Sequence, residues 1–242
     1  MRVALYVTCL VDQVWPQVGT AAVALLRHAG CTVHFDGDQT CCGQPACNSG
    51  WESQGIGLAQ RVIEQFERSG AEALVVPSGS CAAQIHHYPA LFPADSPWRA
   101  RAIGTAGRTF ELATFLLERR AITSVPGRFD GTVGYHDACH GLRDLGIRSQ
   151  PRKLLEMVPG LRFTELPAAD ACCGFGGTFS VKYPDVSVAI ADHKLDAVVK
   201  SGVDAVVSGD VSCLMHLRGR LEKRGSRVRT LHLAEVLAGG LA

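Results

Sequence analysis

The sequence lacks several features that would each have assigned it to a broad functional class. Its 24 basic and 23 acidic residues leave a net charge of only +1, so no excess of one sign attracts nucleic acid or an anionic membrane. No apolar run approaches the ~18 residues that a membrane helix requires. The apolar start over residues 1–8 ends at Cys9 and Asp12, before a signal peptide is complete. These absences predict a cytoplasmic protein without a membrane span.

Two common site motifs are also missing. No Gly-x-Gly-x-x-Gly joins a predicted strand to a helix, so nothing indicates a dinucleotide site. No Cys-x-x-Cys occurs, although structural zinc sites usually take their ligands in close pairs. The chain nevertheless has 10 cysteines among 242 residues. A chain of this length buries a core without disulfides, and clustered cysteines in the cytoplasm are more often metal ligands or catalytic thiols.

Eight of the cysteines belong to an internal repeat, in which each member of the first set recurs 130 to 132 residues later. The first set is Cys9, Cys41, Cys42 and Cys81, and the second set is Cys139, Cys172, Cys173 and Cys213. A Cys-Cys-Gly sequence stands at the centre of each set, whereas Cys31 and Cys47 have no counterpart. We interpret the chain as a duplicated module, with one copy over residues 1–125 and the other over residues 126–242.

Each half alternates short apolar runs with stretches of helical periodicity. Strands are predicted over residues 3–7, 32–35, 73–76, 132–135, 162–166 and 205–207. Helix faces begin at Val18, Ile56 and Val188, and a glycine closes each helix. This alternation predicts an α/β fold made of two pseudo-repeated halves, each with a small parallel sheet. Residues 88–108, which contain several prolines and glycines, are predicted to form an irregular insertion found only in the first half.

The repeated cysteines all follow predicted strands. In the first half they come after the first, second and third strands in turn: Cys9, then Cys41 and Cys42, then Cys81. The second set occupies the same places in its own half. Because the carboxyl ends of parallel strands meet at one edge of a sheet, we expect four thiols to converge at one edge of each half.

The adjacent cysteine pairs bear on what such a set of thiols holds. Neighbouring side chains diverge on an extended backbone, so two adjacent thiolates reach two irons of a cluster more easily than one ion. Thiolates also suit iron–sulfur clusters. The spacing therefore favours iron–sulfur over zinc, with free structural thiols or a vicinal disulfide as the remaining alternatives. Cys31 is interpreted as a small buried residue and Cys47 as an ordinary cysteine or a spare ligand.

The duplicated pattern resembles that of the CCG-domain iron–sulfur proteins, which include the cysteine-rich subunit of heterodisulfide reductase and the iron–sulfur subunit of glycolate oxidase. Three runs of the second half, over residues 135–140, 172–180 and 208–216, are similar to the lactate-utilization branch of that family. The resemblance implies an electron-transfer subunit of a three-protein system that oxidises L-lactate to pyruvate. Its partners would be a ferredoxin-like iron–sulfur subunit and a third subunit, and the chain would not be a complete enzyme.

The chain departs from the family pattern at one cysteine in each half. The wider family ends its motif in Cys-x-x-Cys, and Ser78 and Asp210 stand where the first of those cysteines is expected. Because an ordinary [4Fe–4S] cluster needs only four thiolates, we expect one such cluster in each half. Asp210 is interpreted either as an oxygen ligand or as the N-cap of a following helix, and Ser78 carries the same N-cap interpretation.

Two histidines flank a cysteine of the second set, and the pattern assigns no catalytic residue. His136 and His140 either hydrogen-bond a cluster, donate a proton or bind substrate, or are strand-end residues bonded to the backbone. Two other functions remain open at this stage. One is a zinc-binding structural or interaction protein of the same fold. The other is a catalytic subunit like heterodisulfide reductase, against which the missing fifth cysteine argues.

Overall fold

The computed structural model describes residues 1–239 and contains two parallel sheets of four strands. The first sheet has the order β2-β1-β3-β4, formed by β1 (Arg2–Leu5), β2 (Thr32–His34), β3 (Ala73–Val76) and β4 (Thr109–Glu111). The second has the order β6-β5-β7-β8, formed by β5 (Gly131–Tyr135), β6 (Leu161–Phe163), β7 (Ala205–Ser208) and β8 (Arg229–His232). The same order in both halves confirms the predicted duplicated α/β fold.

Helices connect the strands in a sequence that also repeats. The first half contains α1 (Cys9–Val14), α2 (Gln17–His28), α3 (Gln44–Asn48), α4 (Glu52–Ser69), α5 (Gly79–His87), the 3-10 turn η1 (Tyr88–Leu91), α6 (Pro97–Ala106), α7 (Leu112–Thr114) and the π-helical turn η2 (Phe115–Arg119). The second contains α8 (Cys139–Arg143), α9 (Ser149–Glu156), α10 (Thr178–Lys182), α11 (Pro184–Lys200), α12 (Val211–Lys223) and α13 (Leu233–Ala238). Among these described helices, none has the length and apolar character needed to cross a membrane.

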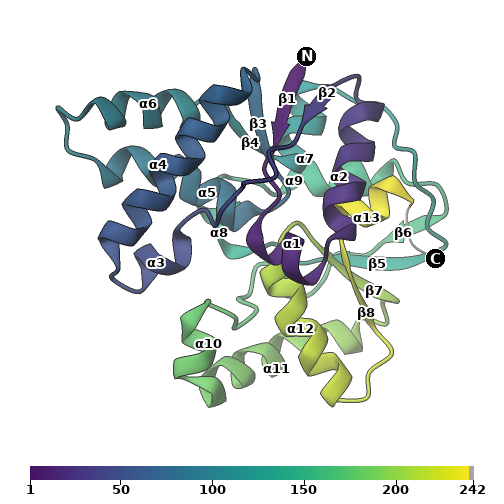
Figure 1. Ribbon diagram of the computed structural model, residues 1–242. Coiled ribbons are helices and arrows are strands. Elements are labelled where there is room, and N and C mark those ends of the chain that lie inside the picture. Colours follow the sequence, from purple (N-terminus) through teal and green to yellow (C-terminus); the bar gives the residue numbers. More distant parts are fainter. Residues whose placement is uncertain (240–242) are drawn as a thin grey trace.

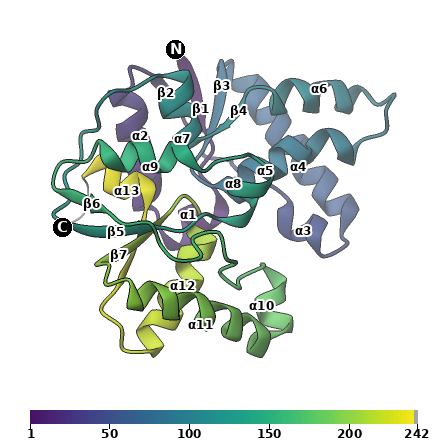
Figure 2. The ribbon, with the colours of Figure 1, turned by 180° about the vertical axis from the view of Figure 1, so that it is seen from behind.

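The two sheets enclose a shared layer of helices. Alternate strand residues point to opposite faces, so Val3 and Leu5 contribute to a central cluster while Ala4 packs on the other side with α4 and α5. In the second half, Val207 contributes to the central cluster and Val206 packs outward against α11 and α12. Figure 1 and Figure 2 show α3–α6 and α10–α12 as two separate groups, with α2 and α13 lying side by side apart from both.

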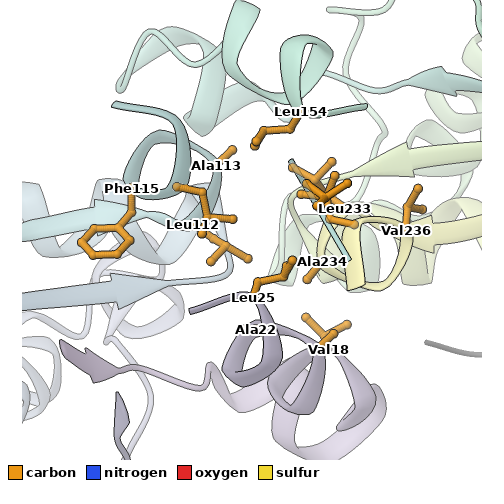
Figure 3. Packing of buried hydrophobic residues seen from close by; sticks show 14 of the residues in the cluster. Val18, Ala22, Leu25, Leu112, Ala113, Phe115, Leu154, Leu233, Ala234 and Val236 are labelled. Atoms are coloured by element: carbon orange, nitrogen blue, oxygen red, sulfur yellow. The ribbon is translucent and has the colours of Figure 1, made fainter. Parts of the chain in front are cut away.

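Helices of the two halves pack against each other in the central layer. The C-terminal helix α13 of the second half packs on α2 of the first half, and α7 of the first half packs on α9 of the second. Figure 3 shows the resulting convergence of buried side chains, including Leu25 from α2, Leu112 from α7, Leu154 from α9 and Leu233 from α13. The four side chains are almost fully buried, so the two halves share one hydrophobic core.

The segment over residues 88–108 is an insertion, since no helix lies between α12 and β8 in the described part of the second half, but the prediction that it is irregular is wrong. Helix α6 begins inside it at Pro97, where Ser96 caps the helix by accepting the N–H of Trp98 at 3.2 Å. Proline is favoured in the first turn because its missing N–H would have no partner there. The proline therefore marks the start of a helix. The fourth strand of each sheet was not predicted, and β6 ends at Phe163, three residues before the predicted end.

Candidate metal centre

All eight repeated cysteines line one cavity of about 260 Å³. The cysteines lie at the carboxyl ends of the strands, as the repeat predicted, but the two sets face each other instead of occupying separate edges. The cavity lies where the halves meet, because loops and helix ends of both halves contribute to its lining. The structure therefore describes one double site.

The first set is centred on the Cys-Cys-Gly turn. Cys42 Sγ lies 3.3 Å from Cys81 Sγ, although the two residues are 39 positions apart. The backbone N–H of Gly43 donates to Cys41 Sγ at 3.4 Å. Gly43 adopts a φ of 88°, in the left-handed region that other residues rarely occupy, and it begins α3. This turn lets two adjacent thiols face the same cavity.

The second set repeats the geometry closely. Cys173 Sγ lies 3.1 Å from Cys213 Sγ, and the N–H of Gly174 donates to Cys172 Sγ at 3.3 Å. Gly174 has a φ of 89°, and a Cβ on it would lie only 2.4 Å from the carbonyl oxygen of Ser187. The glycine of the motif is thus required both by the backbone conformation and by the approach of α11.

Helix N-termini surround the cavity. The helices α1, α5, α8 and α12 each carry a repeated cysteine in the first turn: Cys9, Cys81, Cys139 and Cys213. The start of α5 comes close to α8, because a Cβ on Gly79 would lie 3.0 Å from the Cα of Gly141. The partial positive charge of helix N-termini stabilises thiolates and other anions. The fold therefore favours negative charge inside the cavity.

Hydrogen bonding among the thiols determines which of them carries the negative charge. Hydrogen bonds from Cys42 and then from Cys9 lower the pKa of the Cys41 thiol to about 3, and the Gly43 N–H acts in the same direction. Hydrogen bonding to Cys41 and then burial raise the pKa of Cys9 above its ordinary value. Burial raises the pKa of Cys139 in the second set. Several buried thiolates together need a bound cationic centre to offset the burial.

Different side chains hold the two Cys-Cys loops. In the first half, the hydroxyl of Tyr88 donates to the carbonyl of Cys42 at 2.8 Å, and the hydroxyl of Tyr6 donates to the carbonyl of Thr40. In the second half, Lys194 Nζ donates to the carbonyls of three residues of the loop before Cys172, at 3.0–3.1 Å: Ala168, Ala169 and Ala171.

No motif or spacing in the sequence predicted a role for Lys194. Its side chain is 2% exposed, and burial lowers the pKa of its ammonium. A signal was present, because Lys194 lies within the apolar helix face of Ala191, Leu195 and Val198, at the position that Val62 takes in the first half. A lysine on a core-facing helix side is unusual unless its charge is paired or hydrogen-bonded.

Ser78 and Asp210 meet where the two halves join. Both are N-caps: Ser78 Oγ accepts the N–H of Cys81 at 3.3 Å, and Asp210 Oδ1 accepts the N–H of Ser212 at 3.1 Å. Asp210 Oδ2 also accepts the N–H of Ser80 at 2.9 Å and the hydroxyl of Ser78 at 3.2 Å. One carboxylate thus caps α12 and bonds the start of α5 in the other half.

The remaining candidates separate into near and distant groups. His140 lines the cavity and pairs with Asp144 at 2.6 Å. His136 is buried beside the second set, where one of its ring nitrogens lies within 4.8 Å of both Cys173 Sγ and Cys213 Sγ. Cys31 and Cys47 are not among the residues that line the cavity, and Cys31 is buried.

The donor set fits a polynuclear iron–sulfur group. The cavity, at about 260 Å³, is far larger than the roughly 10–15 Å³ that one water molecule needs on the same measure, so it offers more space than a single metal ion requires. Its metal-binding atoms are chiefly soft sulfur ligands, and N–H groups donate to Cys41 and Cys172. Hydrogen bonds to sulfur and partial burial are typical of protein environments that hold such clusters.

The comparison with protein families agrees with this construction of the site. The family described as "Cysteine-rich domain", or CCG, matches residues 3–86 and again residues 133–218. The chain therefore belongs to the CCG cysteine-rich domain family and contains two copies of the domain. The resemblance inferred from the cysteine spacing is confirmed.

Relatives of one kind match nearly the whole chain. The chain is 48% identical over 240 residues to lactate utilization protein A of an Exiguobacterium species, covering 99% of this chain and 98% of that protein. It is 43% identical over 237 residues to lactate utilization protein A of Bacillus subtilis, covering 98% of this chain and 99% of that protein. The resemblance to the lactate-utilization branch is therefore also confirmed.

A solved structure shares the fold at low sequence identity. A hypothetical protein from Helicobacter pylori aligns with a TM-score of 0.63 and 10% identity. The alignment covers 100% of this chain and 49% of that chain, so this protein spans about half of the other's length. At this identity the similarity supports the fold alone.

Proposed function

We propose that this protein is an iron–sulfur electron-transfer subunit of a cytoplasmic system that oxidises L-lactate to pyruvate. The observation that carries the proposal is the convergence of eight thiols in one cavity, in two matched sets of four. The names of the relatives supply the lactate connection. A ferredoxin-like iron–sulfur subunit and a third subunit are the proposed partners.

Each set of four cysteines would hold one [4Fe–4S] cluster, and such a cluster accepts and releases one electron at a time when bound. The ligands proposed are Cys9, Cys41, Cys42 and Cys81 in the first half, and Cys139, Cys172, Cys173 and Cys213 in the second. The chain's own contribution is to aim the thiols, to donate N–H groups to two of them and to place helix N-termini around the resulting negative charge.

Iron and sulfide counting after anaerobic reconstitution tests the proposal. We expect about eight irons and about eight labile sulfides per chain in the intact protein, as two [4Fe–4S] clusters require. Cys42→Ser is expected to lose about half of both, because it removes one proposed ligand of one set. Cys31→Ser is the matched control and keeps the full content, since Cys31 lies outside the cavity. Equal iron content in Cys42→Ser and the intact protein would contradict the assigned ligands.

A second candidate function is that of a zinc-stabilised interaction protein, and one observation favours it. His136, Cys173 and Cys213 bring three ligand atoms within 4.8 Å of one another, a nitrogen and sulfur set that zinc also accepts. Zinc predicts a colourless protein that gives no electron paramagnetic resonance signal after reduction. Metal analysis separates the candidates, because one or two tightly bound zincs without labile sulfide would overturn the iron–sulfur proposal.

The lactate connection needs a separate test with the partner subunits. We expect L-lactate to reduce the iron–sulfur centres of this chain only when the other subunits are present, as seen by bleaching of their visible absorption. D-lactate is the matched control substrate. Reduction by L-lactate in the isolated chain would show a complete enzyme and contradict the role of electron-transfer subunit.

A further inference from the structure

The two halves differ in the side chain that follows the first central strand. His136 occupies this place in the second half and Tyr6 occupies it in the first, each three residues before a repeated cysteine. The Tyr6 hydroxyl donates to the carbonyl of Thr40 in its own half. His136 has one ring nitrogen bonded to a carbonyl and one without a partner in the described residues, so it offers a free ligand atom beside the second set of thiols.

The bonded nitrogen fixes the form of the imidazole. His136 Nδ1 lies 3.2 Å from the carbonyl oxygen of Ala169, and a carbonyl only accepts, so Nδ1 carries the proton. The lone pair of the neutral ring is then on Nε2. A histidine that ligates a metal commonly donates its other ring N–H to a backbone carbonyl in this way.

The free nitrogen has no partner in the described part of the chain. His136 Nε2 is buried without a hydrogen bond, and the residue is 1% exposed. One of its ring nitrogens lies within 4.8 Å of Cys173 Sγ and Cys213 Sγ, which are themselves 3.1 Å apart. A buried nitrogen without a partner costs free energy, and a metal ion bound by these thiolates would supply the partner.

Lys194 holds this arrangement in place. Its Nζ donates to the carbonyl of Ala169 at 3.1 Å, the same carbonyl that orients His136, and to the carbonyls of Ala168 and Ala171. Three acceptors use three N–H donors, which only the charged ammonium provides. A buried positive charge therefore lies in the second half, and the uncharged Val62 takes its place in the first.

We propose that His136 Nε2 takes the place of one of the four cysteines as a ligand of the second-half centre, so that this centre is reduced before the first-half centre. The inference rests on the proposed iron–sulfur function. Histidine in place of cysteine ligation raises the reduction potential of an iron–sulfur centre, and a nearby positive charge stabilises the added electron. Asp210 opposes this effect, but its carboxylate accepts N–H groups from the starts of helices in both halves.

Pulsed electron paramagnetic resonance on two single-centre proteins tests the ligand. Cys42→Ser leaves the second set intact and Cys173→Ser leaves the first, and both are reconstituted with iron and sulfide and reduced with dithionite. We expect a strongly coupled nitrogen in Cys42→Ser that changes when histidine is labelled with ¹⁵N, and no such coupling in Cys173→Ser. Adding His136→Gln to Cys42→Ser removes the coupling, whereas adding His193→Gln, at an exposed histidine of α11 outside the cavity lining, leaves it unchanged.

A redox titration of the same two proteins tests the order of reduction. At a common potential we expect the ratio of reduced to oxidised centre to be at least about tenfold higher in Cys42→Ser, a difference of about 59 mV for one electron. Centres without histidine coupling, or with equal potentials, would overturn this inference and leave the proposed function standing. If a single-centre protein fails to assemble, the intact protein labelled with ¹⁵N-histidine gives the same decision on the ligand.

If the reconstituted protein contains no iron, the proposed function and the histidine ligand are judged separately. A protein that holds zinc alone contradicts the proposed function, and zinc content then decides the ligand. Loss of second-half zinc in His136→Gln but not in His193→Gln supports ligation by His136. Equal zinc content in both variants rules it out.

Discussion

Lys194 is a buried cation at a position where the first half has a valine, Val62. The lysine replaces the tyrosine hydroxyls that hold the Cys-Cys loop of the first half, and it bonds three carbonyls of the matching loop. Two related modules thus reach the same loop geometry by different means. The difference carries an electrostatic consequence for the second half that the cysteine pattern alone does not reveal.

Replacing Lys194 tests its contribution to the stability of the fold. Lys194→Met keeps the length of the side chain and leaves three carbonyls without their donor, so we expect the free energy of unfolding to fall by at least about 2 kcal/mol. Lys200→Met, on the exposed end of the same helix, is the matched control and should change it by no more than about 0.5 kcal/mol. Urea unfolding of the metal-free proteins, followed by circular dichroism, measures both. Equal values for the two variants would show that the ammonium contributes nothing to the fold.

Glu111 is a buried carboxyl near the join between the halves. Burial is the main cause that raises its pKa to about 7, against the N–H groups of Thr114 and Ala113, which favour the charged form. The folded chain therefore holds this carboxyl protonated at a pH where the unfolded chain has released the proton. Its contribution to stability is present below the ordinary carboxyl pKa and is lost as the pH rises to about 7.

Glu111→Gln should remove this pH dependence, because glutamine keeps an oxygen acceptor and does not titrate. Between pH 4.5 and pH 7 we expect the unfolding free energy of the original protein to fall relative to the variant by roughly 3 kcal/mol, at about 1.36 kcal/mol for each pKa unit. Urea unfolding of both metal-free proteins across this range measures the difference. Glu64→Gln, on the surface of α4, provides the control with no such change. If the unfolding free energies of the original protein and of Glu111→Gln differ by the same amount at every pH in this range, the raised pKa of Glu111 is contradicted.

At the scale of elements, the start of α12 is joined to the start of α5 by one carboxylate. Asp210 bonds the N–H of Ser212 with one oxygen and the N–H of Ser80 with the other. These two helices carry Cys81 and Cys213 in their first turns. The carboxylate therefore fixes the relative position of two helix ends that each bring a thiol to the cavity.

Replacing Asp210 by alanine should lower the free energy of unfolding about twice as much as the loss of one helix cap does. We expect Asp210→Ala to lower the unfolding free energy by roughly 2 kcal/mol and Ser78→Ala by about 1 kcal/mol, since the alanine variants lose two helix-end contacts and one cap respectively. Asp210→Asn keeps an oxygen for one helix only and should fall between them. Thermal and urea unfolding of the metal-free proteins give the order. If Asp210→Asn loses iron but keeps its stability, the residue is a ligand and not a cap.

Several elements could be predicted from the sequence because their signals are local. The glycine that closes α4, Gly70, adopts a positive φ of 61°, and Gly202 after α11 adopts 70°. The prediction of irregular structure over residues 88–108 failed because proline and glycine also occur at the starts and ends of helices. Here Pro97 begins α6 after the N-cap Ser96, and Gly107 ends it. Strands β4 and β8 were missed because each is followed directly by a helix, which hides the strand pattern in a short run.

At the scale of the molecule, the duplication could be predicted and the shared cavity could not. A constant spacing is visible in one chain, but the orientation of the two modules depends on packing between residues far apart, such as Leu25 and Leu233 in the central cluster. The sequence therefore predicted two sites at two sheet edges, and the packing brings them to one cavity. Contacts such as Ser78 to Asp210, 132 positions apart, arise from the same packing.

Because helices of the two halves cover each other's apolar faces, we predict that neither half folds well alone. A fragment of residues 1–125 would expose the face of α2 that α13 covers, and a fragment of residues 126–242 would expose the face of α9 that α7 covers. Exposed apolar faces of this kind drive association. We expect each fragment to be insoluble or aggregated when it is expressed by itself.

Co-expression of the two fragments should restore a soluble one-to-one complex, because the central layer needs both halves and no covalent link between them. Size-exclusion chromatography with circular dichroism distinguishes the outcomes. A boundary placed inside the first module, between residues 70 and 71, is the control and should not be rescued, since it separates β1 from β3 in one sheet. A soluble, monomeric and cooperatively unfolding fragment of residues 1–125 would show instead that the central layer joins two independent domains, and that the shared cavity forms only when they dock.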